Sequence, residues 1–200
     1  RSAFFSLLGA MEWKDAEIVM PAYTCVAMPH AVDLSGNQVR FVDCTSNHFN
    51  VSPEDLCSAL SSDTKMVIPT PLFGYPLEGK DYKETLCQAS PQAFVLHDAA
   101  QSYRNTNPDE KHLAQADGAI FSLGVGKLLC SLYGGMLLLR DKNVFKAVKE
   151  FRDHHFSLPA KIQSFKKWAY GLAVWSAFRN PLLNVTDFLE KKTNLLYRFT

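Results

Sequence analysis

Two polar segments, each placed directly after a short apolar run, decide how this chain is interpreted. Residues 93–102 read Ala-Phe-Val-Leu-His-Asp-Ala-Ala-Gln-Ser, and residues 119–127 read Ala-Ile-Phe-Ser-Leu-Gly-Val-Gly-Lys. Each apolar run predicts a short buried strand. The first strand delivers Asp98 at its carboxyl end, and the second delivers Ser122 with Lys127 just beyond it. Because ligands of open α/β sheets bind outside the carboxyl ends of the strands, these groups predict one binding site.

Strand and helix patterns alternate on either side of these segments, at intervals of roughly 25 residues. The expected strands cover residues 17–20, 38–43, 65–69, 93–96, 119–121 and 136–139. The expected helices cover residues 1–11, 26–32, 53–61, 82–89, 144–151, 161–179 and 183–197. This alternation is typical of βαβ units and predicts a mostly parallel sheet. A boundary is expected near residues 156–159, where the sheet pattern has ended and a helical extension begins.

Composition narrows the class of protein further. The chain has 200 residues and a net charge of +1, without a basic run, so a nucleic-acid partner is not expected. Its five cysteines are scattered without metal-binding spacing, which predicts reduced thiols in a cytoplasmic protein and no metal site. The longest apolar stretch, residues 168–178, is shorter than the ~20 residues that a membrane-spanning helix needs.

The three polar groups suit an aromatic, phosphorylated, aldehyde-bearing cofactor, namely pyridoxal phosphate. A carboxylate at Asp98 could keep the pyridine nitrogen protonated by the effect of opposite charge on pKa. An amine at Lys127 could hold the aldehyde as a Schiff base and carry a proton during the reaction. The Ser122 hydroxyl could donate to the phosphate, and the amides of Arg1 and Ser2 could add to it from a helix N-terminus.

Each of these residues also has a simpler explanation when it is considered alone. Asp98 could cap the turn after its strand, and Lys127 could be a solvated surface lysine. The glycine-rich segment after Ser122 could be a connection that binds nothing.

Several segments together resemble the DegT/DnrJ/StrS family of pyridoxal-phosphate-dependent sugar aminotransferases. The segments that match in order are Glu-Ile-Val-Met-Pro-Ala-Tyr-Thr at 17–24, Phe-Val-Asp at 41–43 with Asn-Val-Ser-Pro at 50–53, Pro-Thr-Pro-Leu-Phe-Gly-Tyr-Pro at 69–76, Val-Leu-His-Asp-Ala-Ala-Gln-Ser at 95–102, and residues 121–135. The last two are the most specific. The separation of 29 residues between Asp98 and Lys127 is also the one that the family shows.

The resemblance implies a fold and a division of the chain. The expected fold is α/β: the three-layer α/β/α large domain of fold type I pyridoxal-phosphate enzymes, with a mainly parallel sheet. This large domain would cover residues 1–155 and would be truncated at its N-terminal side. Residues 156–200 would form a helical extension in place of the family's small C-terminal domain.

The resemblance also assigns roles to individual residues. Asp98 would pair with the pyridinium, Lys127 would be the Schiff-base lysine, and Ser122 would bind the phosphate. Arg1 and Ser2 would contribute amides to the phosphate.

Three further positions complete the comparison with the family. Gln101 would contact the cofactor ring from beside Asp98. Cys25 stands where the family usually carries an aromatic side chain that stacks on the ring. Pro71 stands where the family has a histidine.

The implied activity is transfer of an amino group from an amino acid, expected to be glutamate, to a keto group of a nucleotide-linked sugar in polysaccharide biosynthesis. Such enzymes are homodimers whose site the partner chain completes, so a homodimer is expected. Two alternatives stay open. One is another pyridoxal-phosphate reaction on the same scaffold, such as dehydration or condensation, although dehydratases of this family carry histidine where Lys127 stands. The other is a non-catalytic binding or regulatory homologue, which Cys25 favours.

Overall fold

A computed structural model describes residues 1–44, 49–75, 77, 86, 90, 92–102, 116–124, 126–127, 130–157 and 160–177. Contacts divide the chain into two compact units, Arg1–Phe156 and Ser157–Thr200, and the first contains the sheet. The predicted helices at 82–89 and 183–197 lie outside the described residues, apart from the single helical residue Leu86.

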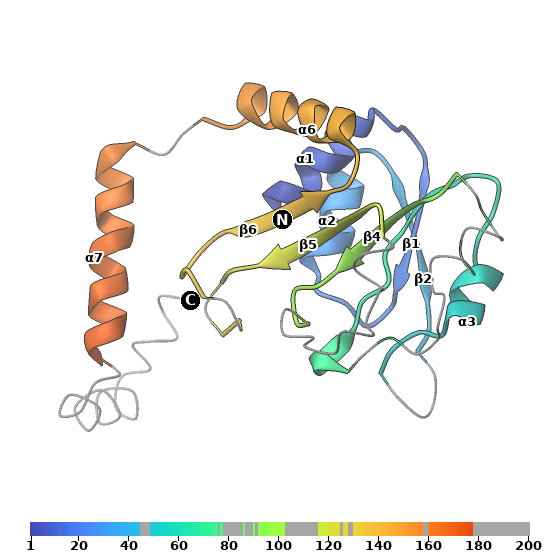
Figure 1. Ribbon diagram of the computed structural model, residues 1–200, viewed down its shortest axis with the longest axis horizontal. Coiled ribbons are helices and arrows are strands. Elements are labelled where there is room, and N and C mark those ends of the chain that lie inside the picture. Colours follow the sequence, from blue (N-terminus) through green and yellow to red (C-terminus); the bar gives the residue numbers. More distant parts are fainter. Residues whose placement is uncertain are drawn as a thin grey trace. The chain divides into compact units, whose positions relative to one another are not determined.

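Six strands form one sheet in the order β2-β1-β3-β4-β5-β6 (Figure 1). Their bounds are β1 Glu17–Pro21, β2 Gln38–Val42, β3 Thr64–Val67, β4 Phe94–Asp98, β5 Gly118–Ser122 and β6 Gly135–Leu139. The first five pair in parallel, and β6 runs antiparallel to β5. The predicted strands and the mostly parallel sheet are therefore confirmed.

Alternation of apolar side chains along the central strands explains why the sheet has a core on each face. Ile18 and Met20 of β1 belong to one hydrophobic cluster, whereas Val19 between them belongs to a second. Met66 and Val67 of β3 divide in the same way. Because successive side chains of a strand point to opposite faces, an apolar run places side chains in both cores.

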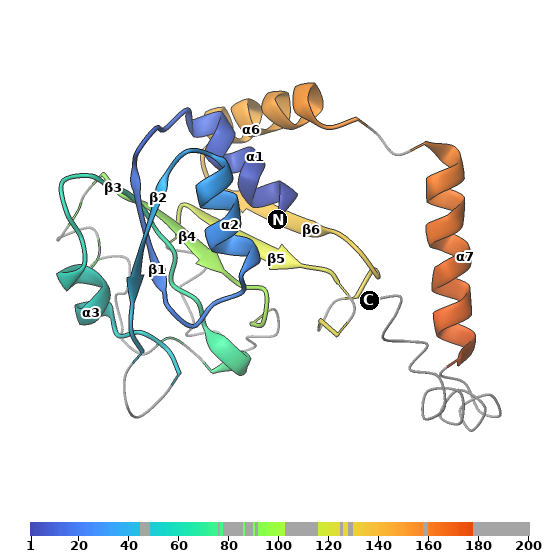
Figure 2. The same cartoon turned by 180° about the vertical axis from the view of Figure 1, so that it is seen from behind.

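Helices cover both faces of the sheet and complete three layers (Figures 1 and 2). α1 (Ser2–Met11), α2 (Ala27–Leu34) and α6 (Lys142–His155) contribute to the cluster on one face, and α3 (Pro53–Ser58) contributes to the other. α1 and α6 approach closely because Gly9 has no side chain: a Cβ there would lie 2.1 Å from the Phe151 ring.

The α3 helix shows how local sequence sets an element's ends. Its N-cap is Ser52, whose hydroxyl accepts a hydrogen bond from the Asp55 amide at 3.0 Å. The helix ends at Ser58, so the predicted end at Ser61 was wrong. Ser61 instead takes part in a turn into β3, in which its amide donates to the Thr64 hydroxyl at 2.9 Å.

In the second unit the structure describes one helix, α7, which covers Lys161–Ala177. Across the described ranges, no helix combines the length and the apolar character needed to cross a membrane.

Candidate functional site

The carboxyl ends of β4 and β5 bring two of the predicted site residues to one edge of the sheet. Asp98 ends β4 and Ser122 ends β5, and the two strands pair in parallel with Asp98 opposite Ile120. Hydrogen bonds fix this edge: the Asp98 amide donates to the Pro69 carbonyl at 3.0 Å, and the Ala99 amide donates to the Ile120 carbonyl at 2.8 Å. The backbone at the end of β4 is therefore fixed to the chain that follows β3 and to β5.

Hydrogen bonds within the connection between β5 and β6 bring Lys127 back to this edge of the sheet. The Leu123 amide donates to the Gly134 carbonyl at 3.1 Å, and the Ser131 amide donates to the Leu123 carbonyl at 2.9 Å. Within the loop, the Lys127 amide donates to the Gly124 carbonyl at 3.2 Å, and Gly126 has a φ of 82° that favours glycine. The turn presents a half-buried Lys127 beside the strand ends.

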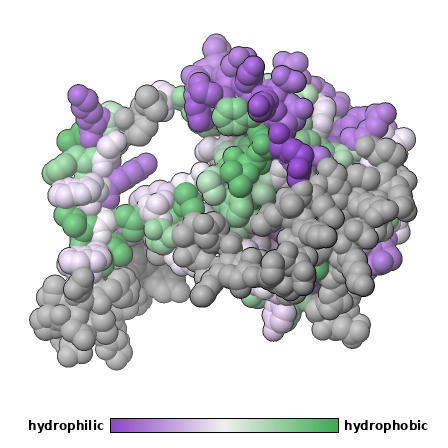
Figure 3. Space-filling view, in the orientation of Figure 1, coloured by the Kyte–Doolittle hydropathy of each residue, from purple (hydrophilic) through white to green (hydrophobic). Residues whose placement is uncertain are grey.

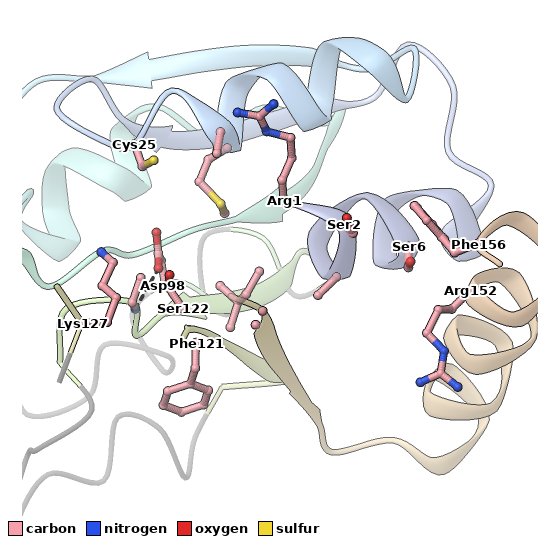
Figure 4. A pocket seen from close by; sticks show the side chains of 17 residues that line it. Arg1, Ser2, Ser6, Cys25, Asp98, Phe121, Ser122, Lys127, Arg152 and Phe156 are labelled. Carbon is pink, nitrogen blue, oxygen red and sulfur yellow. Dashed lines mark hydrogen bonds between the residues drawn. The ribbon is translucent and has the colours of Figure 1, made fainter. Parts of the chain in front are cut away.

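A cavity of about 530 Å³ lies in front of these strand ends. Its lining combines strand ends, the start of α1, the start of α2 and the end of α6 (Figure 4). The lining residues are Arg1, Ser2, Ala3, Ser6, Cys25, Ala27, Met28, Asp98, Ala100, Ile120, Phe121, Ser122, Lys127, Gly134, Gly135, Arg152 and Phe156. Six of the seven predicted site residues thus meet at one cavity: Arg1, Ser2, Cys25, Asp98, Ser122 and Lys127.

The N-terminus of α1 is a feature of this cavity that suits an anion. Arg1 is the N-cap and provides no side-chain hydrogen bond to the helix. The first amides of a helix have no partner inside it and carry a partial positive charge. Arg1, Ser2 and Ala3 all line the cavity, so this helix end faces it.

The cavity lining carries more positive than negative side chains. Arg1, Lys127 and Arg152 are cationic, and Asp98 is the acidic residue among the lining residues. Burial raises the pKa of Asp98, which is 4% exposed, while the Ala100 amide and the charge of Lys127 act in the opposite direction. The Ala100 amide donates to Oδ1 of Asp98 at 3.0 Å. The cavity therefore favours a ligand that carries a negative group and also a positive group that can face Asp98.

The seventh predicted residue, Gln101, is not among the lining residues. Its Oε1 accepts a hydrogen bond from the Phe73 amide at 2.9 Å. Phe73 has a φ of 54°, an uncommon conformation for a bulky residue. Asn50 holds the same turn, because its Oδ1 accepts from the Leu72 amide at 2.9 Å. In the structure Gln101 fixes the loop after β3, and its contact with a cofactor ring stays a prediction.

Arg152 and Phe156 are among the lining residues that the sequence analysis did not name. Arg152 lies in the last turn of α6 and Phe156 is the C-cap residue that follows the helix, both far in sequence from the strand ends. Figure 4 shows Arg152 at the end of the cavity away from Asp98 and Lys127. The available signal was the cluster of basic residues in the last turn of α6. Nothing in the sequence showed that this turn packs beside α1.

The donor set fits pyridoxal phosphate in its chemistry. A buried carboxylate matches a pyridinium nitrogen, a primary amine matches an aldehyde, and a hydroxyl with helix amides matches a phosphate. All of these groups line one cavity. Where an aromatic side chain could stack on the cofactor ring, the lining carries Cys25, which lies just before the N-cap of α2.

Comparisons with known proteins find relatives for most of this chain. The chain is 28% identical over 150 residues to protein MosB of Rhizobium meliloti, covering 74% of this chain and 29% of MosB. It is 28% identical over 140 residues to a UDP-2-acetamido-2-deoxy-3-oxo-D-glucuronate aminotransferase of Pseudomonas aeruginosa, covering 69% of this chain and 38% of the relative. The chain thus spans between a quarter and two fifths of the length of these two relatives.

A solved structure shares the fold. NtdA of Bacillus subtilis, determined with bound cofactor PMP, superposes with a TM-score of 0.66 at 21% identity, over 80% of this chain and 36% of NtdA. The sequence model of the DegT/DnrJ/EryC1/StrS aminotransferase family matches residues 2–173. By this match, which spans the sheet, the cavity and most of α7, the chain belongs to the DegT/DnrJ/EryC1/StrS aminotransferase family.

Proposed function

We propose that the protein is a pyridoxal-phosphate-dependent aminotransferase that moves an amino group from an amino acid, with glutamate as the expected donor, to a keto group of a nucleotide-linked sugar. The observation that carries this proposal is the cavity that Asp98, Ser122 and Lys127 share with the N-terminus of α1. Membership of an aminotransferase family supports the reaction type. The Pseudomonas aeruginosa relative, whose name specifies a UDP-sugar, supports the acceptor class.

Each residue has a distinct part in this proposal. Asp98 would face the pyridine nitrogen, and a positive charge there would oppose the effect of burial on the pKa of Asp98. Ser122 and the amides at the start of α1 would hold the phosphate. Bound in this way, pyridoxal phosphate supplies the electron sink that makes the α-proton of an amino acid acidic.

Lys127 would act at the aldehyde and then on protons. Lys127 is half-buried and lies near the buried Asp98, where its charge partly offsets the rise in pKa that burial causes. As a free amine it would take the α-proton from the donor and return a proton to the cofactor side of the site. This use of one amine for attachment and for proton transfer requires a lysine, and arginine could not replace it.

The cationic lining gives a reason for an anionic acceptor. Arg1 and Arg152 line the cavity in addition to Lys127. A nucleotide-linked sugar carries a diphosphate, which planar guanidinium groups bind well. We include in the proposal a cytoplasmic homodimer, consistent with free thiols at Cys25, Cys44 and Cys130.

The test is a pair of half-reactions followed by absorption spectroscopy on protein loaded with pyridoxal phosphate. Glutamate should convert the spectrum of the lysine-bound cofactor to that of the aminated cofactor, and a keto sugar linked to a nucleotide should reverse the change. Lys127→Arg is the matched control, because it keeps the positive charge and removes the primary amine. A bound cofactor whose spectrum no amino acid changes would favour the non-catalytic homologue instead.

A further inference from the structure

Turn 72–75 is a strained part of the edge where the strands of the sheet end. It follows β3 and includes the short helix η1 (Leu72–Gly74). Phe73 has a φ of 54° and Gly74 has a φ of 80°. A left-handed backbone is costly for a bulky residue, and it persists only where the surroundings fix it. Because such backbone gathers at functional sites, the groups that hold Phe73 in this conformation are candidates for a role in the site.

Burial of apolar side chains fixes only the start of this turn. The helix α6 shows the usual arrangement for a surface element: Val148 packs into the core, and the outer surface of the helix is largely hydrophilic (Figure 3). In turn 72–75, Leu72 is buried, but Phe73 and Tyr75 are 54% and 57% exposed. Hydrogen bonds to the backbone therefore have a larger part in holding this turn.

Asn50 binds both ends of the turn. It is 3% exposed and lies in the connection between β2 and α3. Its Oδ1 accepts a hydrogen bond from the Leu72 amide at 2.9 Å, and its Nδ2 donates to the Tyr75 carbonyl at 3.2 Å. Within the turn, the Tyr75 amide donates to the Leu72 carbonyl at 2.9 Å. One buried carboxamide thus uses its acceptor and its donor to fix the first and the last residue of the turn.

Gln101 joins the turn to the loop that carries Asp98. The Phe73 amide donates to Oε1 of Gln101 at 2.9 Å. At the other end of the same loop, the Asp98 amide donates to the Pro69 carbonyl at 3.0 Å. Residues 98–101 are therefore fastened at both ends to the chain that follows β3. The position of this loop depends on turn 72–75, and the position of the turn depends on Asn50.

We propose that Asn50 is a positioning residue for the Asp98 carboxylate and that it acts through turn 72–75 and Gln101. Its consequence for the cofactor rests on the proposed function, in which Asp98 faces the pyridine nitrogen. A group that pairs with a ligand atom must be held within about 0.5 Å of its productive position by the hydrogen bonds around it. Asn50 supplies such hydrogen bonds from a loop that does not itself line the cavity.

Asn37 provides a matched control at the opposite edge of the sheet, just before β2. It is 6% exposed, its Oδ1 accepts from the Ala16 amide at 3.1 Å, and its Nδ2 donates to the Ser35 hydroxyl at 2.9 Å. Asn50→Leu and Asn37→Leu therefore each remove at least two hydrogen bonds of a buried carboxamide. Each should lower the thermal unfolding midpoint by about 5 °C, so the two variants are compared at similar stability.

Hydrogen exchange of the cofactor-free protein tests the positioning role itself. Amides of residues 98–101 should exchange about tenfold faster in Asn50→Leu, because the loop loses its support, and at an unchanged rate in Asn37→Leu. Gln101→Leu should also speed this exchange, whereas Gln101→Glu, which keeps an oxygen acceptor for the Phe73 amide, should leave it slow. Equal exchange of this loop in Asn50→Leu and Asn37→Leu, or slow exchange in Gln101→Leu, would overturn the proposal.

Titration with pyridoxal phosphate measures the consequence for the site. The affinity should fall about tenfold in Asn50→Leu and stay within about twofold of the unchanged protein in Asn37→Leu. An affinity that both variants share would contradict the positioning role. Absence of binding by the unchanged protein would count against the proposed function alone, because the exchange experiment requires no cofactor and still decides the role of Asn50.

Discussion

The two edges of the sheet use carboxylates in opposite ways. At the amino edge, Glu17 begins β1, and its Oε1 accepts hydrogen bonds from the hydroxyls of Thr64 at 2.5 Å and Ser61 at 2.8 Å. At the carboxyl edge, Asp98 ends β4, and its Oδ1 accepts from the Ala100 amide at 3.0 Å. Both side chains belong to strands that pair in parallel with β3, so the two carboxylates differ in the groups that surround each edge.

The pKa values of the two groups move in opposite directions. Burial acts to raise the pKa of Glu17, but the hydrogen bonds from Thr64 and Ser61, together with Arg40, outweigh it and leave the pKa lowered. Burial dominates at Asp98 and leaves its pKa raised. The amino edge therefore stabilises its carboxylate with the protein's own groups, whereas the carboxyl edge leaves a carboxylate that a positively charged ligand could stabilise.

The largest effect is expected for Asp98→Asn. Without the negative charge, the affinity for pyridoxal phosphate should fall on the order of a hundredfold, because a buried charge pair is lost. The cofactor-free protein should gain on the order of 1 kcal/mol in its free energy of unfolding at neutral pH, since the buried charge is removed. Cofactor titration and thermal unfolding measure the two effects. Loss of stability together with unchanged affinity would show that Asp98 is a structural residue.

Gly118→Ala is expected to have the next largest effect, at the amino edge. A Cβ at this position would lie 2.9 Å from the Leu138 carbonyl oxygen and 3.0 Å from Cδ2 of Leu139. Strand β6 would have to shift, which should lower the free energy of unfolding by about 2 kcal/mol. Gly124→Ala is the control, because the nearest atom to its Cβ would be 3.9 Å away. Denaturant unfolding should show a clear difference between the two variants, and similar midpoints would contradict the packing described for β5 and β6.

Glu17→Gln is expected to have a smaller effect. The amide oxygen can still accept from Thr64 and Ser61, but the stronger hydrogen bonds to a charged acceptor are lost. The ion pair with Arg40, at 3.5 Å and partly exposed, adds little. The free energy of unfolding should therefore fall by about 1 kcal/mol. The affinity for pyridoxal phosphate should not change. A weaker affinity in this variant would show that Glu17 at the amino edge also affects the cofactor site at the carboxyl edge.

The smallest effect is the pH dependence of stability in Glu17→Gln and Asp98→Asn. Because the pKa of Glu17 is lowered by folding, its contribution to stability is present above the ordinary value of 4.5 and is lost as the pH falls through the lowered value. Because the pKa of Asp98 is raised by folding, its destabilising effect appears as the pH rises through the raised value. The stability differences of both variants from the unchanged protein should thus shrink in acid. Thermal unfolding as a function of pH measures them.

The sequence indicated the strands well because apolar runs with polar ends are local features. All six expected strands exist, with ends that differ by no more than two residues. Strand order depends on contacts between distant residues, which no local pattern encodes. The hydrogen bonds of Glu17 are an example: they join residues 44 and 47 positions apart. The end of α3 was misplaced for a related reason, since the turn at Ser61 depends on the start of β3.

The cavity lining was predicted at the ends of β4 and β5 and at the start of the chain, whereas its part near the end of α6 was missed. Asp98, Ser122 and Lys127 were found because the ends of neighbouring parallel strands must meet at one edge. Arg152 and Phe156 reach the cavity through the packing of α6 on α1, which the sequence did not reveal.

The measurement that tests the central claim most directly is chemical trapping at the carboxyl edge. The protein is incubated with pyridoxal phosphate, reduced with borohydride, digested, and its peptides are weighed by mass spectrometry. The account predicts that Lys127 carries the pyridoxyl group. In Lys127→Arg, the peptide that contains position 127 should carry no pyridoxyl group. A group carried by other lysines in proportion to their exposure, with none on Lys127, would contradict it.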